Sequence, residues 1–415
     1  MDGQLLDTAA LGAGDDTPKP RINNGFLEFP VYHVRGGTST GIVLWDRVTP
    51  AETELKEELV RHIMGVPLEG THANNRQITG LGRTIPTSNK VFFADLEYDD
   101  AGSPRIVSNF AQLANEKAAI DWSVNCGNMS AALPMWAYDI GFLSPDTSKK
   151  TYSIDIRNTN TGVIAGSRIV FDRNRRMDFC EIPGVSGRYP EVDLFLYSPA
   201  GAKTGKLLPT GAAREQIDGI DVSCVDVAVP MVILKASDLG KTAQETIPEL
   251  DADTAFKERL RRIWVEAGQR MELKNRDGRL LTPEELAASE TIPKICIIGA
   301  PENCGTVTVR YFTPQSGHNS MAVTGGCCLA AACLVEGSVA QEVATGVNLP
   351  TTELAEYQVD IENPAGVLTA IVEAASGNDG VRITKAAYTR SAQILLKGYS
   401  TLYRASDALI KSLGL

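Results

Sequence analysis

The sequence has few of the residues from which metal sites and disulfide frameworks are built. It contains only four histidines, and none lies at ligand spacing from a cysteine or carboxylate cluster. Its eight cysteines form no C-x-x-C pair and no regular framework. We therefore expect reduced thiols, no disulfides and no bound metal.

Long apolar runs are also missing, since the longest candidate, Cys327–Val335, is about half as long as a membrane span. The first residues lack the basic start and apolar core of a signal peptide. The net charge of −11 argues against nucleic acid or an anionic membrane as the main partner. We expect a cytoplasmic protein that binds a small molecule, and a homodimer is left open.

Short β-branched or aromatic segments bounded by Gly, Pro, Asn or Asp are abundant, and they predict strands. A chain of 415 residues is too long for one ordinary core, so two domains are expected. Residues 198–215 are rich in Gly, Pro and Thr and are typical of a linker. Residues 1–24 are expected to form a mobile tail.

Two segments of small and apolar residues, Met129–Gly141 and Cys327–Gly337, predict helices without a polar face, which are normally buried. Each follows a strand-rich stretch and a glycine-containing turn, and each has a cysteine at or near its start. This repetition predicts two strand-rich domains, each around one buried helix, with both helix N-termini directed at a shared cleft. Pro134 should kink the first helix or limit it to a short opening turn.

The turn that opens the first of these helices surrounds Cys126 with polar groups. A helix N-terminus offers free N–H groups and a partial positive charge, which bind carboxylates and lower the pKa of a cysteine. Gly127 lets the backbone approach a ligand, while Asn125 and Asn128 can donate from their amides. The alternative is a cysteine that only packs, as free cysteines usually do.

Two further stretches of the first half are suited to close contact with a ligand. Arg35–Gly41 places Ser39 and Thr40 in a polar turn after a strand, although an ordinary tight turn is the alternative. In Arg76–Phe93, a glycine-containing loop leads to Lys90 at the start of a strongly apolar strand. Lys90 is either solvated or, if it faces a closed cleft, a base whose pKa is lowered by desolvation.

The second half contains a comparable stretch, Thr306–Gly326, which runs from a strand into the second apolar helix. Arg310 on that strand could clamp a carboxylate with two hydrogen bonds. His318 lies in a turn, where a hydrogen-bonded or surface histidine is the more common case.

Taken together, these stretches resemble the PrpF family of double-bond isomerases, which have the diaminopimelate-epimerase-like fold. The motifs occur in the family's order between about residues 26 and 400, and the ordered set is specific to the family. They are Arg-Gly-Gly-Thr-Ser at 35–39, Gln-Ile-x-Gly-x-Gly at 77–82 with Thr-Ser-x-Lys at 87–90, Asp-Trp-Ser-x-Asn-Cys-Gly-Asn at 121–128, Gly-Lys-Leu-x-Pro-Thr-Gly at 205–211, and Arg310 with His318 and Ala-Val-Thr-Gly at 322–325.

The resemblance implies an α+β fold with two pseudo-symmetric domains, each a β-barrel-like sheet around a central helix, and a site between them. We expect the first domain to comprise residues 25–200 with roughly 385–415, and the second to comprise residues 201–384. The resemblance also implies a cofactor-free reaction that moves or rotates a carbon–carbon double bond in a polycarboxylic acid. The family's catalytic pair falls on Lys90 and Cys126, with Lys90 expected as the base and Cys126 as the proton donor or second base.

A small polycarboxylate is therefore the expected substrate, with aconitate first and 2-methylaconitate or oxalomesaconate next. The chain departs from the family at Thr40, Thr79 and Arg83, where Lys, Asp and Gly are usual. These departures affect the choice of acid more than the type of reaction, because Thr40 removes one cation. The predicted substrate contacts are Ser39, Thr40, Ser88, Asn125, Gly127, Asn128, Arg310, His318, Gly325 and Gly326.

Two other classes of function stay open. An amino-acid racemase or epimerase of this fold would use a second, opposed cysteine, for which Cys327 and Cys328 are available. A non-catalytic accessory partner of an aconitase-type enzyme would bind carboxylates but would need neither Lys90 nor Cys126.

Overall fold

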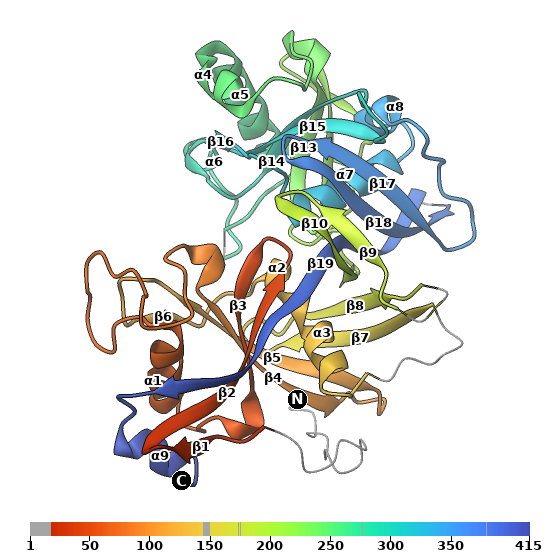
Figure 1. The fold of residues 1–415 in the computed structure, drawn as a ribbon. Helices are drawn as coiled ribbons and strands as arrows, with labels where there is room; N and C mark the ends of the chain where they lie inside the picture. Colours follow the sequence, from red (N-terminus) through yellow and green to blue (C-terminus); the bar gives the residue numbers. More distant parts are fainter. Residues whose placement is uncertain (1–17, 144–149, 173, 175, 276, 379) are drawn as a thin grey trace. The chain divides into compact units, whose positions relative to one another are not determined.

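The computed structural model describes residues 18–415 except 144–149, 173, 175, 276 and 379 (Figure 1). Most of the expected tail lies outside the described residues, but Arg21–Asn23 form strand β1, which pairs with β2. Internal contacts divide the chain into two units. The first comprises Met1–Glu181, Val185–Leu194 and Arg390–Leu415, and the second comprises Ile182–Gly184 and Phe195–Thr389.

The first unit is built mainly from strands, in keeping with the β-branched and aromatic segments of its sequence. Its core order is β2–β3 antiparallel, β3–β4 parallel, β4–β5 antiparallel, β5–β7 parallel and β7–β8 antiparallel, and β19 adds antiparallel to β2. The strands are β1, β2 (Phe26–Gly36), β3 (Ser39–Trp45), β4 (Lys90–Tyr98), β5 (Pro104–Leu113), β6 (Ile120–Asp121), β7 (Thr151–Asn158), β8 (Ile164–Val170) and β9 (Phe179–Ile182), with parts of β10 (Val185–Tyr197) and β19 (Gly380–Leu402).

Helices pack on both faces of the first unit's sheet. On one face, α1 (Thr53–Met64) and α9 (Asp407–Ser412) share a hydrophobic cluster with alternate residues of β2, β3 and β4. On the other face, α2 (Gly127–Ser130) packs against β2 and β3, and α3 (Ala132–Asp139) packs against β2, β5 and β8 (Figure 1). A short 3₁₀ helix, η2 (Asp46–Val48), follows β3, and another, η3 (Pro86–Ser88), precedes β4.

Pro134 explains why the first apolar helix is divided into α2 and α3. A proline has no N–H to donate to the carbonyl four residues earlier, which is that of Ser130, the last residue of α2. Ala131 between the two segments still has helical dihedrals of −61° and −19°. The proline therefore limits the opening segment to a short turn without redirecting the chain, as expected from the sequence.

The second unit repeats the strand order of the first. Its pairs are β12–β13 antiparallel, β13–β14 parallel, β14–β15 antiparallel, β15–β17 parallel and β17–β18 antiparallel. Its strands are β11 (Glu215–Ile217), β12 (Ile220–Val227), β13 (Val229–Lys235), β14 (Lys294–Gly299), β15 (Val307–Thr313), β16 (Ser316–Gly317), β17 (Ala355–Asn363) and β18 (Gly366–Gly377), with the first part of β19 on β18.

The helices of the second unit also occur at matching points of the order. Between β13 and β14 the chain forms η4 (Ala236–Leu239), α4 (Ile247–Ala252), α5 (Thr254–Arg270) and α6 (Pro283–Ala288), where the first unit has η2 and α1. Between β16 and β17 it forms α7 (Val323–Cys333) and α8 (Val339–Val343), where the first unit has α2 and α3. Helix α7 is buried from Gly325 to Cys333 and packs on β12, β13, β17 and β18.

The predicted linker, residues 198–215, is organised by a buried carboxylate. Asp226 on β12 is fully buried, and its Oδ2 accepts hydrogen bonds from the backbone N–H groups of Lys203 and Thr204, each at 2.8 Å. The Thr204 hydroxyl donates to the same oxygen at 2.9 Å. The glycines and threonines of this segment therefore form a folded loop within the second unit, which their composition alone did not indicate.

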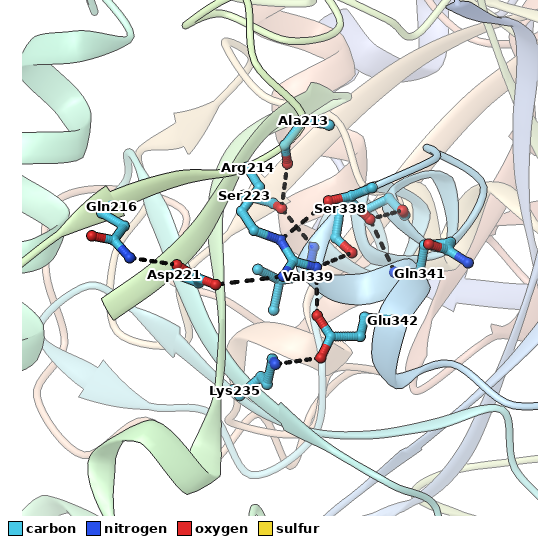
Figure 2. A network of polar contacts seen from close by, with 12 residues as sticks. Ala213, Arg214, Gln216, Asp221, Ser223, Lys235, Ser338, Val339, Gln341 and Glu342 are labelled. Carbon is cyan, nitrogen blue, oxygen red and sulfur yellow. Dashed lines mark hydrogen bonds and ion pairs between the residues drawn. The ribbon is translucent and has the colours of Figure 1, made fainter. Parts of the chain in front are cut away.

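The end of this loop is tied to α8 by the polar network shown in Figure 2. The Ser223 hydroxyl donates to the Ala213 carbonyl at 2.6 Å, and Arg214 donates to the Ser338 carbonyl at 3.2 Å. Arg214 also forms an ion pair with Glu342 of α8. Because both serines are fully buried, the network fixes the backbone on each side of it.

The close approach of α2 to β2 leads to a first prediction. A Cβ at Gly36 would lie 2.7 Å from the backbone carbonyl oxygens of Asn128 and Met129. We expect Gly36→Ala to lower the free energy of unfolding by about 1–3 kcal/mol, since the backbone must shift. Gly398→Ala on β19 is the matched control, because nothing lies within 4 Å of a Cβ there. Equal denaturant midpoints for the two variants would contradict this packing.

A second prediction concerns Glu191. Burial raises its pKa to about 7, and the negative charges of Asp193 and Asp178 add to this effect. The positive charges of Arg168 and Arg188 lower the pKa and only partly offset the rise. Its ordinary value is 4.5, so the folded state binds the proton more tightly than the unfolded state. This group's contribution to stability is therefore lost as the pH rises from about 4.5 to about 7.

Thermal unfolding between those pH values tests the assignment. Glu191→Gln cannot ionise, so its stability should fall less over this range than that of the wild type. Exposed Glu353 offers the matched variant Glu353→Gln, which should keep the wild-type pH dependence. Parallel curves for Glu191→Gln and the wild type would show that Glu191 does not titrate as described.

Candidate active site

Lys90, the first residue of β4, lies on the face of the sheet that carries α2. Val91 and Phe93 belong to the cluster with α1, so the alternation of the strand directs Lys90 and Phe92 to the other face. Extending the β3–β4 register by one residue places Gly41 beside Lys90. A Cβ at Gly41 would lie 2.2 Å from the Lys90 carbonyl oxygen, so only glycine fits there.

The Lys90 amine is buried and has a neutral partner. The residue is 8% exposed, and Nζ donates a hydrogen bond of 2.6 Å to Gln112 Oε1 on β5. Nζ also lies 5.4 Å from the centre of the Phe110 ring. Among the residues that the structure describes, no carboxylate forms an ion pair with Lys90. The amine is thus held in place by an uncharged acceptor.

Cys126 lies on the same face of the sheet, at the start of α2. Its thiol is half-buried, and Sγ lies 3.9 Å from the hydroxyl oxygen of Ser39, the first residue of β3. Ser39 is two positions before Gly41 and therefore shares the face of Lys90. The structure thus brings Ser39, Lys90 and Cys126 to one face within the first unit.

Asn128 joins α2 to the turn that precedes β3. Its Nδ2 donates to the Thr38 hydroxyl at 3.2 Å, and its Oδ1 accepts from Arg390 Nε at 2.9 Å. Gly37 in the turn has a φ of +54°, and its N–H donates to the Ser391 carbonyl at 2.9 Å. Asn128 therefore holds the turn, the helix start and β19 together.

The remaining predicted residues of the first unit differ in their availability to a ligand. Asn125 is exposed and its Oδ1 accepts from the Cys126 N–H at 2.7 Å, while Gly127 is exposed as the first residue of α2. Ser88 is buried in η3, just before Lys90. The Thr40 hydroxyl is buried and has no hydrogen-bond partner among the described residues, and the alternation of β3 directs it to the face opposite to Ser39.

The arginine of the first motif is a structural residue. Arg35 donates to Gln393 Oε1 at 2.8 Å, to the Gly37 carbonyl at 2.8 Å and to the Ser391 carbonyl at 3.1 Å. Its guanidinium also stacks 4.6 Å from the centre of the Tyr189 ring. Burial lowers its pKa, but these acceptors fix it between the turn and β19.

Gln77, the first residue of the Gln-Ile-x-Gly-x-Gly motif, fixes Asn89, the residue before Lys90. Gln77 is buried with a φ of +53°, and its Nε2 donates to the Met64 carbonyl at 2.9 Å and to Asn89 Oδ1 at 2.7 Å. The Thr84 N–H donates to Gln77 Oε1 at 2.7 Å. The glycine-containing loop thus folds around one amide, which fixes Asn89 and the start of β4.

Arg310 and His318 belong to the second unit, where backbone groups already satisfy much of their bonding capacity. Arg310 is 7% exposed and donates to the Glu245 carbonyl at 2.6 Å and to the Val309 carbonyl at 3.0 Å. His318 Nδ1 accepts from the Ser320 N–H at 3.0 Å. Burial lowers the pKa of His318 and nearby Lys294 lowers it further, while the hydrogen bond with the Ser320 backbone opposes them.

The small residues of α7 serve packing. A Cβ at Gly325 would lie 2.5 Å from the Tyr311 ring, and one at Gly326 would lie 2.7 Å from the Leu368 side chain. The Cys327 and Cys328 thiols are buried. The Cys327 sulfur lies 3.8 Å from the Ala387 carbonyl oxygen, and the Cys328 sulfur lies 3.4 Å from that of Val225. Burial raises the pKa of Cys328, so this thiol is a poor nucleophile or base.

Three residues near Lys90 and Cys126 were missed by the sequence reasoning, namely Asn89, Gln112 and Arg390. Each is polar and buried or half-buried, and each lies within or beside a strand. That pattern was the available signal, because a buried polar side chain needs a partner. The identity of each partner depends on strand register, which the sequence does not show.

The residues that the structure describes include neither a group of three potential metal ligands nor a helix that could cross a membrane. All eight cysteines are free.

Comparison with known proteins gives a consistent set of relatives. The 4-oxalomesaconate tautomerase of Pseudomonas putida is 32% identical over 375 residues, covering 90% of this chain and 96% of the relative. The 3-methylitaconate isomerase of Eubacterium barkeri is 28% identical over 407 residues, covering 91% and 98%. A crystal structure of methylitaconate-delta-isomerase matches with a TM-score of 0.75 at 26% identity, covering 93% of this chain and 97% of that one.

The family model described as PrpF protein matches residues 26–403, which is most of the chain. The match includes every motif in which Ser39, Lys90 and Cys126 were found. The protein therefore belongs to the PrpF family, whose characterised relatives are isomerases that act on carbon–carbon double bonds.

Proposed function

We propose that the protein is a cofactor-independent isomerase that moves or rotates the carbon–carbon double bond of an unsaturated tricarboxylic acid. The observation that carries the proposal is the placement of Lys90 and Cys126 on one face of the first unit, with Ser39 beside Cys126. An amine and a thiol so placed can exchange protons with two carbons of one substrate.

The proposed reaction starts when the neutral Lys90 amine removes a proton from a carbon next to a carboxylate and conjugated with the double bond. The C–H electron pair is delocalised over the allylic system and into that carboxylate. The Cys126 thiol then gives its proton to the far carbon, which shifts the double bond. Return of a proton to the original carbon after rotation would instead interconvert cis and trans forms.

A hydrogen-bond donor on this face supports the stabilisation of the developing charge. The Ser39 hydroxyl lies next to the Cys126 thiol on the face of Lys90. A fixed donor of this kind costs no reorganisation when charge develops on a carboxylate. Thr40 follows Ser39 on β3, so the alternation of the strand directs its side chain to the opposite face.

Aconitate is the first substrate proposed, by analogy with relatives that act on related unsaturated acids. Oxalomesaconate is the second candidate, because a relative that covers nearly the whole chain is a 4-oxalomesaconate tautomerase. The replacement of lysine by Thr40 and the presence of Arg83 are the differences on which this choice depends. The assignment of one acid rests on analogy with relatives.

The two other classes of function have less support. A racemase with a second catalytic cysteine would need a reactive thiol in the second unit, but Cys327 and Cys328 are buried in α7. A purely binding protein would have no need for a buried amine held by a neutral amide beside an apolar ring. The isomerase reading uses both groups.

We also infer that the two units are the two pseudo-symmetric domains of a diaminopimelate-epimerase-like fold. The repeated strand order and the matching positions of α2–α3 and α7–α8 support this inference. It also accounts for the similar turns that precede the two apolar helices.

The assignment of Lys90 and Cys126 predicts that either alanine variant loses activity. Lys90→Ala and Cys126→Ala should each lower kcat by about 10²–10⁴-fold, because each removes one proton-transfer group. Lys411→Ala and Cys304→Ala remove exposed counterparts and should keep the wild-type rate. Folded Lys90→Ala and Cys126→Ala proteins with normal turnover would rule out the mechanism.

Proton NMR in D₂O tests the substrate class. The protein is incubated separately with cis-aconitate, 2-methylaconitate, oxalomesaconate and a racemic amino-acid mixture. We expect deuterium to enter one of the unsaturated acids at the carbon that is reprotonated, together with formation of an isomer. That is the far carbon if the double bond shifts, and the original carbon if cis and trans forms interconvert. Exchange only at the α-carbon of an amino acid would favour a racemase, and no exchange with any compound would favour a binding protein.

A further inference from the structure

Gln112 is the only hydrogen-bond partner of the Lys90 amine among the described residues, and it was not among the predicted site residues. It is the last but one residue of β5 and lies directly opposite Lys90 in the β4–β5 register. Directly paired residues of antiparallel strands direct their side chains to the same face. The contact of 2.6 Å is therefore built into the strand pairing.

The orientation of the Gln112 amide is fixed by its surroundings. Three backbone carbonyl oxygens lie around Nε2, those of Pro86 at 3.1 Å, Asn89 at 2.9 Å and Leu113 at 3.1 Å. Reversal of the amide would place its oxygen against these carbonyls and its NH₂ group against the lysine. Only the oxygen can therefore face Lys90.

Asn89, one of the residues whose carbonyl accepts from Gln112, is itself fixed by hydrogen bonds. Asn89 Oδ1 accepts from the buried Gln77 amide at 2.7 Å, and the Leu113 N–H donates to the Asn89 carbonyl at 2.9 Å. A chain of contacts thus runs from the loop of the second motif through Asn89 and Gln112 to the Lys90 amine. Its last member offers an acceptor without a charge.

That neutrality matters for a base. A carboxylate at this distance would favour the charged ammonium form and leave less of the neutral amine at a given pH. An apolar residue would leave the amine free to turn away from the substrate. An amide oxygen holds the amine in one direction while adding no charge.

We propose that Gln112 is a positioning residue that holds the Lys90 amine in the direction needed for proton abstraction while leaving it free to be neutral. This proposal rests on the proposed function, in which Lys90 is the base. Gln112 acts through Lys90 and does not itself exchange a proton with the substrate.

The first test removes the acceptor. Gln112→Leu replaces the amide by an apolar side chain of similar size, which cannot accept a hydrogen bond from Lys90. We expect kcat to fall by about 10²-fold with little change in KM, because the base is misdirected while substrate binding persists. Gln358→Leu, at an exposed position of β17, is the control and should keep wild-type kinetics. Circular dichroism and thermal unfolding establish that each variant is folded.

The second test changes the charge and keeps the shape. Gln112→Glu should move the acidic limb of the pH–rate profile to higher pH by about one to three units, because a carboxylate favours the ammonium form. Gln269→Glu, on the exposed side of α5, adds the same charge and should leave the profile in place. A merely structural role for Gln112 would lower stability without this shift.

Lys90→Ala is measured in the same assays to separate the two proposals. If Lys90→Ala keeps activity towards the acid that the wild type converts, the proposed function is wrong. If Lys90→Ala is inactive while folded Gln112→Leu and Gln112→Glu match the wild type in kcat and pH profile, only the positioning role is wrong. If Gln112→Leu does not fold, the pH profile of Gln112→Glu decides the question.

Discussion

The backbone of α2 lies directly on β2 because Gly36 has no side chain at the contact, and β3 meets the start of β4 in the same way at Gly41. These two approaches set the distance between the start of α2 and the strand edge at which Lys90 begins. The Cys126 thiol reaches the Ser39 hydroxyl only because the helix is so close to the sheet. The chemistry proposed for the first unit depends on this close packing.

The second unit uses the same order of elements for a different purpose. Lys294 begins β14 as Lys90 begins β4. Extending the β14–β15 register by one residue places Thr313 opposite Lys294, where the first unit has Gln112 opposite Lys90. The small residues of α7 meet the Tyr311 ring and the Leu368 side chain instead of backbone. The buried helix is therefore an apolar core element there, and its cysteines are packed thiols.

Sequence reasoning could propose Lys90 and Cys126 as a pair because both lie in short motifs, and the structure places them on one face of the first unit. Gln112 was missed because its role comes from strand register, which joins residues 22 positions apart. Arg310 donates to backbone carbonyls and His318 accepts from a backbone N–H, which a sequence cannot show, and their contact with a substrate stays a prediction. The fold of residues 198–215 was not apparent from the sequence because Asp226, which organises it, lies 22 and 23 residues beyond the backbone N–H groups that it binds.

The nature of the contacts at the glycines determines which of them can change together with a neighbour. A side chain at Gly36 or Gly41 would meet backbone atoms, and no substitution elsewhere removes a backbone carbonyl. At Gly325 the obstacle is the Tyr311 ring, which a smaller residue could relieve. Paired substitutions can therefore accumulate around α7 as sequences diverge. No second substitution can make room for a side chain at Gly36 or Gly41, against which α2, the helix that follows Cys126, packs.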